Sequence, residues 1–207
     1  MDNKTDYDRT ATIIKNVDAD IIALQELDSA TKRNNGEDVL KILADKTGLF
    51  SLYGAAINYQ GGKYGVGILS KQKSLTHYTI PLPGKEEERV LLVATFKKFI
   101  IFCTHLSLTD ADRLASIGII NRETEKFLKP IYLLGDMNAE PNSNPIVALQ
   151  KTWTLLSGDS ATFPASIPKK CIDFIFVLNK KVKVISHKVI NEAMASDHRP
   201  VFVEIKK

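Results

Sequence analysis

The pattern of apolar and polar positions predicts a helix, a strand and a second helix near the start of the chain. Apolar residues recur on one side of the segment from Tyr7 to Val17, which predicts the first helix. The apolar run from Asp20 to Gln25 predicts a strand buried on both faces and ending at Glu26. Residues Glu37 to Thr47 again carry apolar side chains at helical spacing. A helix followed closely by a buried strand favours a layered α/β architecture.

Shorter apolar runs fill the middle of the chain. Those that are separated by turn residues predict neighbouring antiparallel strands at Leu49 to Ile57, Tyr64 to Ser70, His77 to Leu82 and Val90 to Phe96. A further strand from Phe99 to Thr104 delivers His105 at its end. A helical stripe from Leu108 to Phe127 and a strand from Ile131 to Leu134 follow, in the order of a crossover between parallel strands. His105 and Asp136 are therefore expected at the same edge of a sheet.

The last part of the chain contains a short predicted helix from Pro145 to Gln150 and three strand-like runs. These runs are Ile172 to Leu178, Val182 to Ile190 and Val201 to Ile205. The dipeptide Asn179-Lys180 predicts a hairpin turn between the first two. The sequence contains no internal repeat, low-complexity tract or linker, which predicts a single domain over residues 1–207.

Composition and charge narrow the class of protein without choosing a substrate. Apolar residues make up 44% of the chain and charged residues 25%, as in ordinary globular proteins. The formal net charge of +4 comes from scattered lysines and arginines, so a nucleic-acid partner is neither demanded nor excluded. Cys103 and Cys171 lie in apolar runs and are expected to be buried, inert thiols. No apolar run reaches transmembrane length and the opening residues lack a signal-peptide core, so the sequence as given predicts a soluble, cytoplasmic protein.

Several polar residues lie where apolar runs meet turns. Asp136 and Asn138 follow a short buried strand, and together they can orient a water molecule or bind a metal, although an Asp-x-Asn turn is the simpler interpretation. Asp173 lies between Ile172 and Phe174 and needs a partner, for which a histidine ring is a good candidate. The full set is Glu26, His105, Asp136, Asn138, Asp173, Ser196, Asp197 and His198.

The chemistry of this set favours a hard cation. Four carboxylates, an amide and two histidines without a cysteine suit Mg²⁺ or Mn²⁺ better than zinc. Such a set is typical of phosphoryl transfer, in which a metal neutralises charge, a carboxylate activates water and other groups stabilise the phosphoryl oxygens. For each residue taken alone, a cap or a satisfied surface group remains the alternative.

These residues also carry a family resemblance over almost the whole chain. The segments that carry it are Asp-Ile-Ile-Ala-Leu-Gln-Glu (20–26), Gly-Val-Gly-Ile-Leu-Ser-Lys (65–71), Thr-His-Leu (104–106), Gly-Asp-Met-Asn-Ala-Glu-Pro (135–141), Ile-Asp-Phe-Ile-Phe-Val (172–177) and Ser-Asp-His-Arg-Pro-Val (196–201). In this order they resemble the motifs of the endonuclease/exonuclease/phosphatase (DNase I-like) superfamily. The resemblance implies a four-layer α/β/β/α sandwich of two packed, largely antiparallel sheets, with the site at one end.

The resemblance also implies roles for individual residues. Glu26 resembles the metal-binding glutamate and Asp197 a further metal-site carboxylate, while Asp136 and Asn138 resemble the pair that orients water and phosphate. Two histidines complete the implied site: His198, partnered by Asp173, as a general base or phosphate contact, and His105 as a phosphate-stabilising group. Arg89 and Arg113 are weaker candidates for phosphate contacts, and for each a solvated surface arginine is the alternative.

One departure from the family pattern affects the expected activity. Members of the superfamily usually begin with an apolar strand that ends in a metal-site asparagine, and this sequence shows neither. We therefore expect an absent first strand, whose loss would also hide a signal peptide and so leave export open. The leading hypothesis is a Mg²⁺- or Mn²⁺-dependent phosphodiesterase or phosphatase that acts on nucleic acid, a phospholipid head group or a small phosphoester. The second hypothesis is a catalytically impaired binding module on the same scaffold; the sequence does not fix the oligomeric state.

Overall fold

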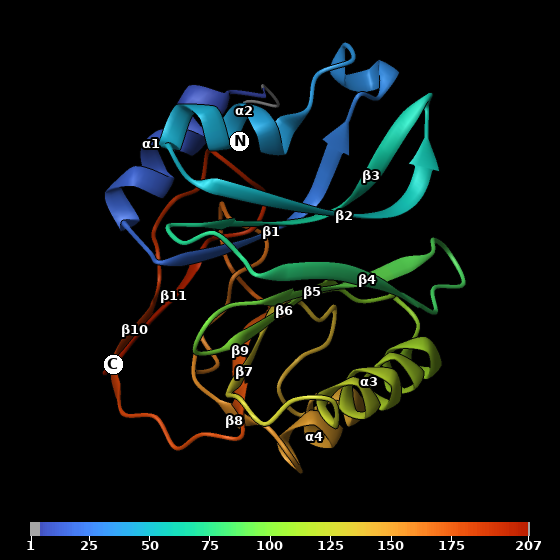
Figure 1. Cartoon of the computed structure of the whole chain (residues 1–207), viewed down its shortest axis with the longest axis vertical. Coiled ribbons are helices and arrows are strands. Elements are labelled where there is room, and N and C mark those ends of the chain that lie inside the picture. The colour runs from blue at the N-terminus through green and yellow to red at the C-terminus, as the bar shows by residue number, and fades with distance from the viewer. Residues whose placement is uncertain (1–4, 207) are drawn as a thin grey trace.

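Four layers of secondary structure stack on one another in the computed structural model, which describes residues 5–206 (Figure 1). The outer helices α1 (Tyr7–Val17) and α2 (Val39–Thr47) cover a three-stranded antiparallel sheet. Its strands, in spatial order, are β1 (Ile21–Ser29), β3 (Gly62–Ser70) and β2 (Phe50–Tyr59). This arrangement confirms the predicted α/β architecture.

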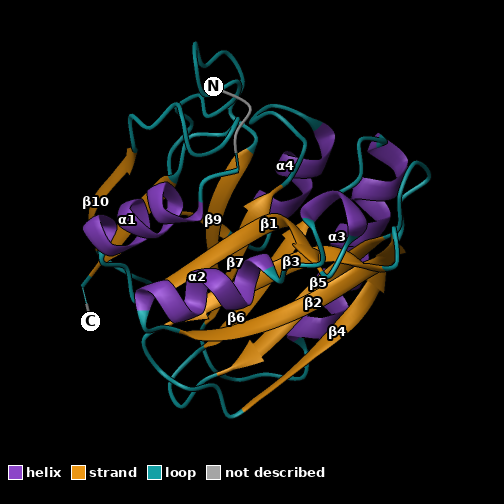
Figure 2. Ribbon diagram, turned by 90° about the horizontal axis from the view of Figure 1, so that it is seen from above, coloured by secondary structure: helices purple, strands orange, loops and turns teal. Residues whose placement is uncertain are grey.

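A six-stranded sheet forms the third layer and two helices form the fourth (Figures 1 and 2). The sheet contains, in spatial order, β4 (Thr76–Leu82), β5 (Arg89–Thr95), β6 (Ile100–His105), β7 (Ile131–Asp136), β9 (Asp173–Leu178) and β8 (Thr154–Leu155). The covering helices are α3 (Asp110–Thr124) and α4 (Asn144–Gln150). A separate two-stranded ribbon joins β10 (Val184–Val189) to β11 (Val201–Ile205).

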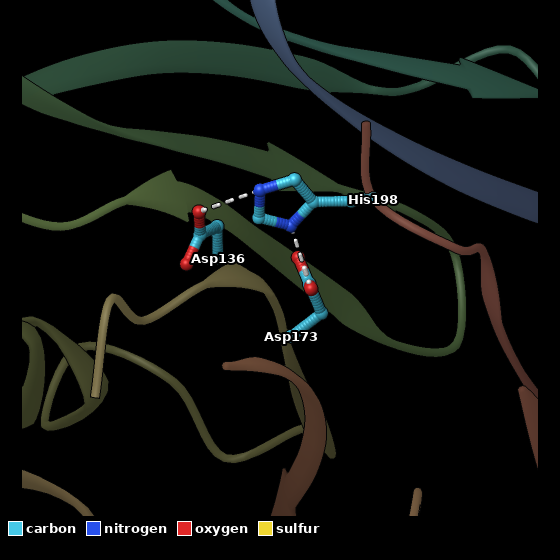
Figure 3. A group of neighbouring side chains, drawn as sticks. All are labelled: Asp136, Asp173 and His198. Atoms are coloured by element: carbon cyan, nitrogen blue, oxygen red, sulfur yellow. Dashed lines mark hydrogen bonds and ion pairs between the residues drawn. The ribbon is translucent and has the colours of Figure 1, made fainter. Parts of the chain in front are cut away.

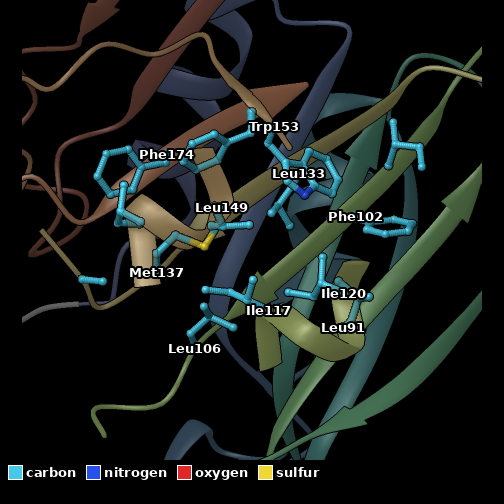
Figure 4. Packing of buried hydrophobic residues seen from close by; sticks show 14 of the residues in the cluster. Leu91, Phe102, Leu106, Ile117, Ile120, Leu133, Met137, Leu149, Trp153 and Phe174 are labelled. Carbon is cyan, nitrogen blue, oxygen red and sulfur yellow. The ribbon is translucent and has the colours of Figure 1, made fainter. Parts of the chain in front are cut away.

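Three apolar clusters fill the spaces between the layers. Ala11, Leu40 and Leu43 belong to the cluster between the first two helices and their sheet. A second cluster lies between the two sheets, and the largest lies between the six-stranded sheet, α3 and α4 (Figure 4). Phe102 and Ile120 are completely buried in this largest cluster. Burying a side chain of this size contributes roughly 1.5–3 kcal/mol to stability, so these layers hold the strand ends in fixed positions.

The centre of the six-stranded sheet confirms the predicted crossover. Strands β6 and β7 run parallel, with helix α3 between them in the chain. Gly135 makes their close pairing possible, because a Cβ atom at that position would collide with the carbonyl oxygen of Thr104. Strand β9 pairs with the other side of β7 in the antiparallel sense. Polar residues at the ends of three adjacent strands are therefore brought to one edge.

Two predicted strand features at the start of the chain are wrong. Strand β1 does not end at Glu26 but continues to Ser29, with a bulge between Leu24 and Leu27. It is also only half-buried, because it forms the edge of its sheet. The sequence pattern did not reveal the bulge, since the apolar run before it continues past it with Leu27.

The predicted hairpin at Asn179-Lys180 is also wrong. Strand β9 pairs with β7 and β8, whereas β10 pairs with β11. Two consecutive apolar runs with a turn between them look like a hairpin in the sequence. Strand β9, however, already has β7 on one side and β8 on the other, so β10 cannot pair with it there. The two-residue strand β8 was not predicted.

The expected absence of a first strand stays a prediction. Residues 1–4, which belong to the opening segment on which it rests, lie outside the described residues. Within residues 5–206, β1 and β11 are edge strands, each hydrogen-bonded to one neighbouring strand. No helix in this range is long and apolar enough to cross a membrane.

Candidate active site

Three polar side chains come from matching positions on three adjacent strands. His105 at the end of β6 pairs in register with Asp136 at the end of β7, and Asp136 pairs in turn with Asp173 at the start of β9. Residues that are paired directly across strands point to the same face of a sheet. The two carboxylates therefore lie side by side, which is unfavourable unless a positive charge separates them.

His198 supplies that positive group from a loop without regular secondary structure. Its ring lies between the two aspartates (Figure 3). His198 Nδ1 lies 2.8 Å from Asp173 Oδ2, and His198 Nε2 lies 4.0 Å from Asp136 Oδ2. The shorter contact is a hydrogen bond, and the longer one leaves the Nε2 edge of the ring facing Asp136.

The surrounding carboxylates control the charge of His198. Burial by itself lowers the pKa of His198, but the hydrogen bond to Asp173 and the charges of Asp173, Asp136 and Asp197 raise it to about 9. Burial and the charge of Asp173 together raise the pKa of Asp136. The hydrogen bond from the backbone N–H of Asn138 lowers it in part. The site thus concentrates negative charge around one imidazolium.

His105 differs from His198 because its surroundings keep it neutral. The ring is buried, with Nε2 3.6 Å from Asp136 Oδ2 and Nδ1 3.3 Å from Arg89 Nη1. Burial, followed by the positive charges of Arg89 and His198, lowers the pKa of His105 to about 3. Because the Arg89 guanidinium is a donor, Nδ1 is assigned as the acceptor and Nε2 as the protonated nitrogen that faces Asp136.

The Asp-x-Asn segment has the tight turn that its sequence predicts. The backbone N–H of Asn138 donates to Asp136 Oδ1 (2.7 Å), and Asn138 Nδ2 donates to the carbonyl of Leu106 (2.8 Å). Asn138 has a φ of 48°, in the left-handed region that asparagine tolerates. The amide thereby ties the loop after β7 to the loop after β6 and keeps both site loops together.

Glu26 and Asp197 lie near Asp136, Asp173 and His198, and the two carboxylates repel each other. Glu26 occupies the bulge of β1 with a φ of 57°, an uncommon backbone conformation for a glutamate. Burial, and then the charge of Asp197, raises the pKa of Glu26, while His198 and a hydrogen bond with Tyr64 lower it. The bulge therefore turns a carboxylate from the first sheet toward the residues of the second.

The donor atoms fit a divalent cation. Asp136, Asp173 and His198 offer ligand atoms within 4.8 Å of one another, and Glu26 and Asp197 add two further carboxylates nearby. Oxygen-rich sets of this kind suit Mg²⁺ or Mn²⁺. The sequence predicted Glu26 and Asp197 as metal ligands, whereas the tightest geometric group is the other three residues. Within that group, Asp173 Oδ2 and His198 Nδ1 already bond each other.

The two candidate arginines are both buried, so the interpretation of either as a solvated surface arginine is wrong. Arg89 faces His105 and forms ion pairs with Glu87 (2.9 Å) and Glu86 (3.6 Å). It lines a narrow recess with His105 and Tyr64, and it also lines an adjoining hollow of about 570 Å³.

Arg113 lies on α3 and has a different environment. Its Nη1 donates to the carbonyl of Ser107 (3.0 Å), and its Nη2 pairs with Asp110. These contacts hold the loop between β6 and α3 in place. Its role as a phosphate contact stays a prediction.

Sequence reasoning missed two residues next to the histidine. Thr162 Oγ1 donates to Asp173 Oδ2 (2.5 Å), and the Phe163 ring lies 4.8 Å from the His198 ring, centroid to centroid. The segment 162–165 carries no charged residue and forms no regular element. Its position before the predicted strand that contains Asp173 was the only available signal.

Sequence comparison assigns the family. The model of the endonuclease/exonuclease/phosphatase family matches residues 1–198. The chain belongs to the endonuclease/exonuclease/phosphatase family. The resemblance seen in the motifs is thereby confirmed. Endonucleases, exonucleases and phosphatases, the activities in the family's name, all hydrolyse phosphoester bonds.

Individual similar proteins match most of the chain. The uncharacterized protein YbhP of Escherichia coli K12 is 27% identical over 216 residues, which cover 93% of this chain and 85% of YbhP. Among solved structures, an endonuclease/exonuclease/phosphatase from Bacteroides vulgatus has a TM-score of 0.80 at 20% identity, covering 97% of this chain and 89% of that one. A mannosyl-6-phosphatase from Bacteroides thetaiotaomicron has a TM-score of 0.77 at 17% identity, covering 97% and 90%. These structures confirm the DNase I-like fold.

Proposed function

We propose that this protein is a divalent-metal-dependent phosphoester hydrolase whose site is built on His105, Asp136, Asp173 and His198. The observation that carries the proposal is the position of the His198 ring, which lies between two carboxylates at adjacent strand ends and bonds one of them at 2.8 Å. An imidazole held by one carboxylate and directed toward a second resembles an acid–base pair beside a water-orienting group.

In this proposal, each residue has a role that follows from its surroundings. Asp136, buried and fixed by the turn at Asn138, orients and deprotonates the attacking water. His198, aligned by Asp173, donates a hydrogen bond or proton to a phosphoryl oxygen. Neutral His105 offers its Nε2–H to the developing charge, with the positive charge of Arg89 behind it.

Glu26 and Asp197 are the proposed metal ligands. Both have carboxylate oxygens beside the acid–base group, and burial, followed by the charge of Asp197, raises the pKa of Glu26. A bound Mg²⁺ or Mn²⁺ would act as a Lewis acid and neutralise phosphoryl charge. The rest of the substrate has room in the hollow next to Arg89, which Thr79 and Glu88 also line.

The test is hydrolysis of bis(p-nitrophenyl) phosphate and p-nitrophenyl phosphate with Mg²⁺, with Mn²⁺ and with EDTA. We expect metal-dependent turnover, and the preferred substrate will distinguish a phosphodiesterase from a phosphatase. Asp136→Asn and His198→Ala should each lower kcat/KM by about 100-fold or more, because each removes an acid–base group. Supercoiled plasmid DNA, added as a third substrate, reports nuclease activity.

Matched variants control for nonspecific effects. Asp45→Asn changes an exposed aspartate that pairs with Lys41 on α2, and His77→Ala changes an exposed histidine on β4. Both should keep wild-type rates. Unchanged rates in Asp136→Asn and His198→Ala would contradict the site assignment. Tight Mn²⁺ binding without turnover of any phosphoester would instead favour the impaired binding module.

A further inference from the structure

The segment 162–165 contacts the His198–Asp173 pair from more than one direction. The Thr162 side chain is completely buried. Its hydroxyl donates to Asp173 Oδ2, the same oxygen that lies 2.8 Å from His198 Nδ1. A carboxylate oxygen that accepts two hydrogen bonds has little rotational freedom. The hydroxyl therefore fixes the oxygen on which the orientation of His198 depends.

The backbone of the same residue ties together the segments on either side of the pair. The Thr162 N–H donates to the carbonyl of Lys170 (2.8 Å), which closes the turn that leads into β9. The Thr162 carbonyl accepts from the N–H of Arg199 (2.9 Å), the residue directly after His198. The neighbouring ring of Phe163 packs at 43° against the His198 imidazole. One dipeptide thus contacts the carboxylate, the ring and the loop that carries the ring.

The loop that carries His198 is also bonded to this segment through its backbone. Residues 190–200 form no helix or strand, although they carry both Asp197 and His198. The Ala165 N–H donates to the carbonyl of Asp197 (2.6 Å), and Arg199 Nε donates back to the carbonyl of Ala165 (2.6 Å). Residues 162–165 therefore hold the loop on both sides of His198, whereas Arg9 Nη1 holds it further upstream, at the carbonyl of Met194.

We propose that Thr162 is a positioning residue for His198. Its hydroxyl holds Asp173 so that Nδ1 of His198 is bound and Nε2 faces Asp136. Groups that orient a catalytic histidine through its carboxylate partner change activity without touching the substrate. This proposal adds a residue to the proposed hydrolase site, and its kinetic test rests on the proposed hydrolase function.

Two substitutions separate the hydroxyl from the shape of the side chain. Thr162→Val keeps the size but removes the donor, and Thr162→Ser keeps the donor. We expect Thr162→Val to lower kcat for bis(p-nitrophenyl) phosphate by about tenfold with KM within about twofold. Thr162→Ser should stay close to wild type. Thr47→Val is the matched control, since Thr47 Oγ1 donates to the carbonyl of Leu43 at the end of α2.

A second readout does not depend on hydrolysis. The proton on His198 Nδ1 should give a low-field ¹H NMR resonance, which is assigned by its absence in His198→Ala. This resonance should persist in Thr162→Ser and disappear or move upfield in Thr162→Val. If the wild type hydrolyses no phosphoester, the resonance still tests the role of Thr162. Should Thr162→Val fail to fold, as judged by a thermal melt, Thr162→Ala takes its place.

Two outcomes would overturn the proposal. One is a Thr162→Val protein with wild-type kcat and an unchanged resonance. The other is a Thr162→Ser protein that loses as much activity as Thr162→Val, which would mean that keeping the hydroxyl does not keep His198 in position.

Discussion

Arg89 and Arg113 are buried to a similar extent but face different groups. Arg89 lies against His105 and two glutamates, next to the acid–base group. Arg113 bonds Ser107 and Asp110 in the loop before α3. A lysine keeps the charge of an arginine but loses its planar fork of donors. The same substitution should therefore have different consequences at the two positions.

We predict that Arg89→Lys lowers kcat/KM by roughly tenfold or more, because His105 and the substrate lose a fixed donor. Arg113→Lys should lower Tm by a few degrees and leave kcat/KM within about twofold. Steady-state kinetics and thermal melts of the two variants decide this. Equal losses of activity in both would place Arg113 in the site as well.

Residue identities alone are sufficient to predict much of the site. An aspartate between apolar neighbours needs a partner, and the fold brings His198 to Asp173. The contribution of Thr162 was not predictable, because a threonine in an irregular segment is compatible with almost any environment. Burial of Arg89 and Arg113 was equally hidden. Their ion-pair partners Glu86, Glu87 and Asp110 lie only two or three residues away, and such local pairs do not reveal which elements cover the side chain.

The pairing of β6 with β7 depends on a glycine. A Cβ atom at Gly135 would collide with the carbonyl oxygen of Thr104, and this carbonyl belongs to the neighbouring strand. Rigid backbone on both sides leaves no flexible group that can move away. A substitution there must push apart the two strands that carry His105 and Asp136.

We predict that Gly135→Ala destabilises the fold by about 1–3 kcal/mol and also lowers activity in the folded fraction. Gly118→Ala is the control, because nothing lies within 4 Å of a Cβ atom at that position on α3. Alanine is the better helix former, so Gly118→Ala should stabilise by about 0.5–1 kcal/mol. Urea unfolding measures both. A Gly135→Ala protein as stable as wild type would show that β6 and β7 can separate at no cost.

Element-scale prediction succeeded where local pattern and packing agreed. The strand–helix–strand order around α3 was sufficient for the crossover, because parallel neighbours require such a connection. The prediction of a hairpin at Asn179-Lys180 was wrong because the partners of a strand depend on the packing of the whole sheet. The bulge at Glu26 was missed for a related reason. The apolar pattern of β1 continues through the bulge, and only the pairing of β1 with β3 shows the shift in register.

At the scale of the whole molecule, charge is distributed unevenly. A net charge of +4 with scattered basic residues suggests no strong field. The fold nevertheless gathers Glu26, Asp136, Asp173 and Asp197 around His198. Such a cluster costs stability unless a cation compensates it. Binding of a cation to the folded chain alone should therefore stabilise the whole protein.

We predict that Mg²⁺ or Mn²⁺ at about 100 times its Kd raises Tm by roughly 5–10 °C, and that EDTA reverses the increase. Glu26→Gln and Asp197→Asn should abolish the increase while leaving the metal-free protein as stable as wild type or slightly more stable, because each removes a repelling charge. Asp45→Asn, which lies away from the site, should keep the full increase. Differential scanning calorimetry with and without the ion measures these four proteins and, as a fifth, Asp173→Asn. If Glu26→Gln keeps the increase and Asp173→Asn abolishes it, the ion is instead held by Asp136, Asp173 and His198. The acid–base role of His198 would then have to be abandoned, because a ring nitrogen that binds a metal has no proton to donate.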